Sequence, residues 1–169
     1  MKKYNMGLDV GSTTVKVVVI DDQDNKVYSE YRRHFSDIRS TIIQLIKETY
    51  ETMGDVELTI AVTGSGGLSV SKWLNVDFVQ EVIACTKTVE EVIPRTDVAI
   101  ELGGEDAKIT YFKGGIEQRM NGTCAGGTGA FLDQMASLLN TNTAGLNELA
   151  KGYQTIYPIA SRCGVFAKT

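Results

Sequence analysis

Histidine, proline and cysteine are scarce in this sequence, and each scarcity excludes something. Among 169 residues there are one histidine, two prolines and three cysteines. The single histidine, His34, gives no visible Ser/His/Asp or Cys/His pattern, so nucleophilic hydrolase chemistry is not indicated. We expect His34 to lie at the surface, at the end of a strand. An odd number of widely spaced cysteines argues against a disulfide framework and leaves buried thiols or metal ligands.

Long apolar runs and an excess of positive charge are also missing. No run of apolar residues approaches the roughly 20 that a membrane-spanning helix requires. The net charge of −4 gives no sign of nucleic acid or an anionic membrane as a partner. The first residues lead into a strand pattern and do not have the form of a signal peptide. We therefore expect a cytoplasmic protein that binds neither nucleic acid nor membrane.

Glycine, in contrast, is abundant, and it separates short segments that alternate between strand and helix patterns. The strands are expected at 4–10, 14–21, 26–34, 58–62, 98–102, 107–112 and 115–120. The helices are expected at 78–93 and 143–151, after the glycine turn 126–129, and between a Ser36 cap and Gly54. Strand 14–21 is apolar on both faces, which predicts burial on both. The pattern restarts at Val98, which indicates two lobes, 1–94 and 95–169.

The segment 9–14 (DVGSTT) is the first that could carry chemistry. Glycine at position 11 lets backbone N–H groups approach a phosphate closely, because no Cβ intrudes. The hydroxyls of Ser12 and Thr13 can donate to phosphate oxygens. Asp9, at the end of a strand, suits a Mg²⁺ ion held through water. Taken alone, the segment is equally consistent with a plain hairpin turn that exposes an aspartate.

The segment 101–106 (ELGGED) repeats this design. Gly103 and Gly104 again permit backbone contact with a phosphate, and Glu101 or Asp106 could hold a metal or orient an attacking water. Both segments join a strand, an acid, a glycine turn and a second strand, which makes the pair stronger evidence than either alone. Neither is a Walker A loop.

Lys16 and Cys85 each allow two interpretations. Lys16 interrupts the valine-rich strand and could reach a phosphate, although a solvated edge position is as consistent with the pattern. Cys85 shares a helical face with Val82 and Val89, and we expect it to serve packing rather than to bind a metal.

Together, the two glycine segments resemble the phosphate motifs of the actin, Hsp70 and sugar-kinase ATPase superfamily. The segment 121–132 (NGTCAGGTGAFL) narrows the resemblance to the activator ATPases of 2-hydroxyacyl-CoA dehydratases and the ATPase subunits of benzoyl-CoA reductases. In that family a Cys-Ala-x-Gly-Thr-Gly-x-Phe-Leu run supplies one iron–sulfur ligand, which corresponds to Cys124. A second ligand precedes a Val-Phe-Ala sequence, which corresponds to Cys163.

The resemblance implies an α/β fold of the ribonuclease H-like (actin/Hsp70-like) type, with mixed sheets and flanking helices in two lobes. It implies ATP or ADP with Mg²⁺ between the lobes. The residues at the phosphates would then be Gly11, Ser12, Thr13, Lys16, Gly103, Gly104 and Glu105, with Asp9, Glu101 and Asp106 as the catalytic carboxylates and Asp9 holding Mg²⁺ through water.

The same resemblance implies a [4Fe–4S] cluster that two subunits of a homodimer share, because each chain offers two ligands and the cluster takes four. Cys124 precedes a helix start, whose partial positive charge favours an anionic cluster. ATP hydrolysis would drive one electron from this cluster to a 2-hydroxyacyl-CoA dehydratase-type partner. An electron donor such as ferredoxin or flavodoxin would reduce the cluster again.

Some features depart from the family pattern. Glu101 and Glu105 stand where the second phosphate motif usually has Asp and Gln, and we expect the extra methylene of Glu101 to change the metal geometry. The family's adenosine-binding glycine motif and closing helix do not occur, so we expect a truncated second lobe and an activity that needs the missing C-terminal part. Two other functions stay open: a small-molecule kinase of the same superfamily, and a non-catalytic actin-like regulatory module.

Overall fold

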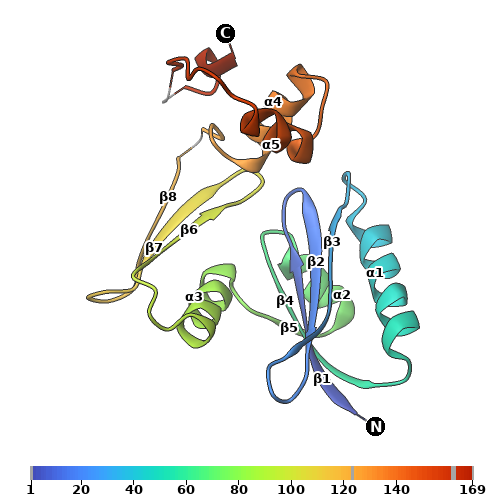
Figure 1. Cartoon of the computed structure of the whole chain (residues 1–169). Coiled ribbons are helices and arrows are strands. Elements are labelled where there is room, and N and C mark those ends of the chain that lie inside the picture. Colours follow the sequence, from blue (N-terminus) through green and yellow to red (C-terminus); the bar gives the residue numbers. More distant parts are fainter. Residues whose placement is uncertain (1, 123, 161–162, 169) are drawn as a thin grey trace. The chain divides into compact units, whose positions relative to one another are not determined.

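The computed structural model describes residues 2–122, 124–160 and 163–168, and it divides into two compact units, Met1–Pro94 and Arg95–Thr169 (Figure 1). In the first unit the strands are β1 (Lys3–Val10), β2 (Thr14–Ile20), β3 (Lys26–Arg33), β4 (Glu57–Thr63) and β5 (Asp77–Phe78), and the helices are α1 (Ile38–Met53), α2 (Gly67–Leu74) and α3 (Glu81–Val92). The sheet order is β3-β2-β1-β4-β5. The β1–β4 and β4–β5 pairs are parallel and the others antiparallel, which makes the sheet mixed.

One face of this sheet forms the core of the unit. Alternate side chains of β1 and β2, from Met6 to Val19, are buried with residues of α1 and α2 in a single apolar cluster. On the opposite face Val18 of β2 is 39% exposed. The prediction that this strand is buried on both faces was therefore wrong for the described part of the unit, because α1 and α2 share the core of the same face.

The segment between β3 and α1 also differs from the sequence expectation. Asp37, not Ser36, caps α1, and its carboxylate accepts the Ser40 N–H at 3.1 Å. Ser36 has φ 69°, in the left-handed region, so it lies outside the helix. His34 is only 6% exposed, so the expectation of a surface histidine was wrong as well.

Helix α2 and strand β5 were not predicted from the sequence. The helix has eight residues and begins directly in the glycine turn after β4. Gly67 packs there against the side chains of Val62 and Phe78, closely enough that a Cβ would lie 3.2 and 3.1 Å from them. Phe78 thus belongs to β5, and α3 begins three residues later than expected, at Glu81. Cys85 is half-buried on the face of α3 that includes the buried Thr86.

The second unit contains a three-stranded antiparallel sheet, β6 (Val98–Leu102), β7 (Ala107–Tyr111) and β8 (Glu117–Met120). After it come α4 (Gly129–Leu138), α5 (Thr143–Lys151) and a short 3₁₀ helix, η1 (Phe166–Lys168). Across the described residues of both units, the helices are too short or too polar to cross a membrane.

Candidate functional site

The turn between β1 and β2 has a glycine that the fold itself does not require. The Gly11 N–H donates to the Thr14 carbonyl at 2.9 Å and closes the turn. A Cβ on Gly11 would meet nothing nearer than this carbonyl oxygen, at 3.5 Å, and the φ of Gly11 is not in the left-handed region. An open glycine of this kind leaves the backbone accessible to a ligand such as a phosphate. Ser12 is exposed beside it and Thr13 is half-buried.

Asp9 and Lys16 lie directly opposite each other at this end of the β1–β2 ladder. The Lys16 ammonium is 2.6 Å from Asp9 Oδ2, and its Nζ also lies 5.6 Å from the centre of the Tyr31 ring. The carboxylate and ammonium side chains are 27% and 43% exposed, so both are accessible to a ligand from the open side. The first turn therefore combines a carboxylate, a cation and an open backbone.

Thr63, which the sequence did not single out, adds a further oxygen beside Asp9. The two residues pair across the parallel β1–β4 ladder, so their side chains leave the same face of the sheet. Among the described residues, the Thr63 hydroxyl is the one buried side-chain oxygen or nitrogen without a hydrogen-bond partner. Gly64 follows with φ 91°, packed so closely on the Asp9 carboxylate that a Cβ would collide with it. A carboxylate beside an uncommitted hydroxyl fits hydrated Mg²⁺, which prefers oxygen ligands.

His34 contacts the backbone of the first turn through its side chain and its backbone N–H. Its Nε2 lies 3.2 Å from the Gly11 carbonyl oxygen, and its Nδ1 accepts the Ser36 N–H at 3.1 Å. Its backbone N–H donates to the Thr13 carbonyl at 3.2 Å. An accepting Nδ1 and a carbonyl oxygen beside Nε2 match the tautomer that carries its proton on Nε2. The buried histidine thus ties the turn to the segment that precedes α1.

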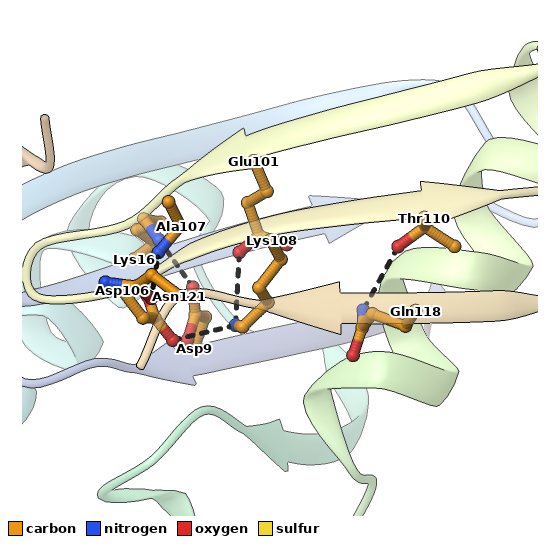
Figure 2. Close-up of polar contacts among 9 residues, drawn as sticks. All are labelled: Asp9, Lys16, Glu101, Asp106, Ala107, Lys108, Thr110, Gln118 and Asn121. Atoms are coloured by element: carbon orange, nitrogen blue, oxygen red, sulfur yellow. Dashed lines mark hydrogen bonds and ion pairs between the residues drawn. The ribbon is translucent and has the colours of Figure 1, made fainter. Parts of the chain in front are cut away.

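The second turn, between β6 and β7, repeats the acid–lysine arrangement (Figure 2). Glu101 lies opposite Lys108 in the ladder, and Lys108 is only 6% exposed. Its Nζ is 3.2 Å from Asp106 Oδ2 and 3.6 Å from Glu101 Oε1. A buried lysine needs such partners, and here its one positive charge is shared between the two candidate carboxylates. Lys108 was not predicted from the sequence, although it lies seven positions after Glu101, just as Lys16 lies seven positions after Asp9.

The glycines of the second turn have a different role from Gly11. Gly103 donates its N–H to the Asp106 carbonyl at 2.8 Å, and a Cβ on Gly103 would collide with the Asp106 carboxylate. Gly103 is therefore required by the turn itself. Glu105 is exposed and Gly104 is half-buried at the tip. The Gly103 and Gly104 carbonyls accept the N–H groups of Gly129 and Ala130 at 2.9 and 2.8 Å. Helix α4 thus begins on the turn.

The two cysteine segments of this unit are packed together through bare backbone. A Cβ on Gly126 would lie 3.4 Å from the Gly164 nitrogen, and a Cβ on Gly164 would lie 3.3 Å from the Gly126 Cα. Gly126 directs its N–H at Cys124 Sγ, 3.4 Å away. This contact brings together the segments that carry Cys124, which is exposed, and Cys163, which is half-buried.

The surroundings of Cys163 favour the thiolate form of its side chain. The N–H groups of Phe166 and then Val165 hydrogen-bond its sulfur and hold the pKa of the thiol below its ordinary value, because they stabilise the thiolate. The thiolate is the form that binds iron. In the part of the chain that the structure describes, no cluster of three or more Cys, His, Asp or Glu residues forms a metal site.

Comparison with known proteins decides the family. The sequence profile of the BadF/BadG/BcrA/BcrD ATPase family matches residues 6–169. The chain belongs to this family. The activator of lactoyl-CoA dehydratase from Anaerotignum propionicum is 34% identical over 98% of the chain and 65% of the relative. The chain spans about two thirds of the length of the curated relatives that it matches.

Two solved structures share the fold of this chain. Component A of (R)-2-hydroxyglutaryl-CoA dehydratase from Acidaminococcus fermentans gives a TM-score of 0.85 at 28% identity, covering 98% of this chain and 65% of that chain. The activator of 2-hydroxyisocaproyl-CoA dehydratase from Clostridium difficile, with bound ADPNP, gives 0.82 at 30% identity, covering 98% and 63%. The expected actin/Hsp70-like α/β fold and the expected family are both confirmed.

Proposed function

We propose that this chain is part of an ATPase that couples ATP hydrolysis to one-electron transfer from a [4Fe–4S] cluster to a 2-hydroxyacyl-CoA dehydratase-type protein. The observation that carries the proposal is the contact between the second turn and the cysteine segment. Two hydrogen bonds attach the start of α4 to Gly103 and Gly104, and Cys124 lies five residues before that helix start. A change at the phosphate turn is therefore placed to move a cluster ligand.

The residues of the two turns would contact different parts of the nucleotide. The open backbone at Gly11, with Ser12 and Thr13, and the turn at Gly103 to Glu105 offer donors for phosphate oxygens. Asp9 with Thr63 would hold hydrated Mg²⁺, which neutralises phosphate charge when it is bound. Glu101 or Asp106 would orient the attacking water, and Lys16, whose side chain is partly exposed, would supply a cation for a phosphate.

The cluster chemistry follows from the count of thiolates. A [4Fe–4S] cluster takes four, and Cys124 and Cys163 supply two, so a two-fold homodimer would complete it. Cysteines outside disulfide bonds are typical of a reducing compartment, which supports a cytoplasmic location. Ferredoxin or flavodoxin is the kind of donor that could reduce the cluster. The choice of partner rests on the relatives, three of which are named as activators of 2-hydroxyacyl-CoA dehydratases.

Anaerobic purification of the native polypeptide tests this function against a kinase or a regulatory module. We expect a brown protein with the broad visible absorption of a [4Fe–4S] cluster, and MgATP hydrolysis without a phosphorylated small-molecule product. A colourless, iron-free protein that transfers phosphate to an acceptor would support the kinase instead. A protein that neither hydrolyses ATP nor binds iron would support a regulatory module.

Gly11→Ala separates folding from nucleotide binding. Because the backbone and the surroundings of Gly11 accept a methyl group, the variant should match the parent in thermal stability or exceed it, by up to about 1 kcal/mol. The methyl group would block phosphate approach, so we expect the affinity for MgADPNP in the native polypeptide to fall at least about tenfold. Gly7→Ala, in β1 just before this turn, is the matched control, since a Cβ there meets nothing within 4 Å. Equal affinity in both variants would remove the first turn from the phosphate site.

A further inference from the structure

Asn121, directly after β8, makes hydrogen bonds with the backbone of two residues, Ala107 and Cys124. Its side-chain Oδ1 accepts the Ala107 N–H at 2.9 Å, and its backbone N–H donates to the Ala107 carbonyl at 3.0 Å (Figure 2). Its Nδ2 donates to the Cys124 carbonyl at 2.7 Å. One planar amide therefore spans the backbone of β7 and the backbone of the cysteine segment.

The two backbone groups that Asn121 joins belong to the two parts of the proposed machinery. Ala107 follows Asp106, the carboxylate that Lys108 holds and whose carbonyl closes the second turn. Cys124 carries the exposed thiol whose sulfur faces the Gly126 N–H. A displacement of Ala107 therefore acts directly on the amide of Asn121, and through it on the backbone of Cys124.

We propose that Asn121 is a positioning residue that couples the second phosphate turn to the cysteine segment, an inference that rests on the proposed function. The α4 start gives one link between turn and segment, through Gly129 and Ala130, and Asn121 gives a second on the other side of Cys124. Because Cys124 lies between these two links, a movement of the turn would also move the backbone of Cys124. Coupling of this kind is a free energy between two sites and acts in both directions.

Asn121→Asp removes the side-chain hydrogen bond to the Cys124 carbonyl and keeps the one from the Ala107 N–H. Aspartate keeps the oxygen that accepts the Ala107 N–H, but it replaces the donor to the Cys124 carbonyl with a second acceptor. Gln118→Glu is the matched control, because the Gln118 amide donates to the Thr110 hydroxyl at 3.1 Å inside the same hairpin. Both variants exchange an amide for a carboxylate, three residues apart, and only one of them changes a bond to the cysteine segment.

The test compares MgADPNP affinity in cluster-loaded and cluster-free native polypeptide, under anaerobic conditions. In the parent we expect the two affinities to differ by about 5- to 150-fold. Asn121→Asp should retain iron and bind the analogue, yet bring this ratio measurably closer to one than in the parent, because only the link through Gly129 and Ala130 remains. Gln118→Glu should keep the parent ratio. The rate at which iodoacetamide alkylates Cys124 in cluster-free protein, with and without MgADPNP, gives a second measurement, and its nucleotide dependence should be weaker than in the parent only in Asn121→Asp.

Three results would overturn the inference. The first is an affinity ratio in Asn121→Asp equal to that of the parent, and the second is loss of iron from Asn121→Asp. The third is equal affinity for MgADPNP in the cluster-loaded and cluster-free parent protein. The last result, in a parent that contains the cluster and binds MgADPNP, would leave the proposed cofactors in place and remove only the coupling through Asn121. A parent that lacks iron or does not bind the analogue would instead contradict the proposed function, and the inference with it.

Discussion

Asp9→Asn in the native polypeptide is expected to fold like the parent and to lose most ATP hydrolysis, by a factor on the order of 10²–10³. The neutral amide would hold Mg²⁺ and its waters less well than the carboxylate. Folding should survive because the Asp9–Lys16 pair is partly exposed, and pairs of this kind contribute at most about 1 kcal/mol. The measurement is the steady-state ATPase rate at saturating Mg²⁺, together with a thermal melt.

The control for this variant is Glu57→Gln, which breaks an exposed pair with Lys3 in the same sheet, at the opposite end of β4 from Thr63. It should hydrolyse ATP at the parent rate. If Asp9→Asn also hydrolyses ATP at the parent rate, Asp9 is a turn residue, and the magnesium site that we assign to Asp9 and Thr63 does not exist.

Cys124→Ser and Cys163→Ser should each strip iron from the native protein and weaken its dimer. Serine does not supply the thiolate that holds the cluster, and a cluster shared by two chains links iron content to association. Cys163 is further favoured as a ligand by the Phe166 and Val165 N–H groups, which lower the pKa of its thiol. Iron analysis and the mass of the assembly, both measured anaerobically, report the result.

Cys85→Ala is the companion variant, and it should keep both iron and dimer. Cys85 is half-buried in α3, so the change should cost only a packing term of about 1 kcal/mol. Loss of iron from Cys85→Ala alone, or a full iron complement in Cys124→Ser, would show that the ligands have been assigned to the wrong cysteines.

Much of the local structure could be read from the sequence, because the signals there are themselves local. The strand, acid, glycine and strand order of segments 9–14 and 101–106 reappears as two antiparallel hairpins. The glycine run after Cys124 reappears as a loop that leads into α4. In these segments, residue spacing and glycine placement determine the backbone with little help from distant parts of the chain.

The missed residues depend on pairings that are distant in sequence. Thr63 reaches Asp9 through a parallel ladder whose register cannot be read from either strand. His34 is buried because the segment before α1 folds against the first turn, with Ser36 in a left-handed conformation. Asn121 resembles an ordinary turn residue until its partners, Ala107 and Cys124, are seen on either side of it.

The most direct test of the account is an ATP-dependent electron transfer measured without turnover of substrate. The native polypeptide is reduced anaerobically, freed of excess reductant, and mixed with its 2-hydroxyacyl-CoA dehydratase-type partner in the presence of either MgATP or MgADPNP. We predict that, with MgATP, the visible spectrum reports oxidation of the cluster while the partner is reduced by one electron. With MgADPNP, neither protein should change its oxidation state. Electron transfer at the same rate with both nucleotides, or with none, would contradict the claim that hydrolysis drives it.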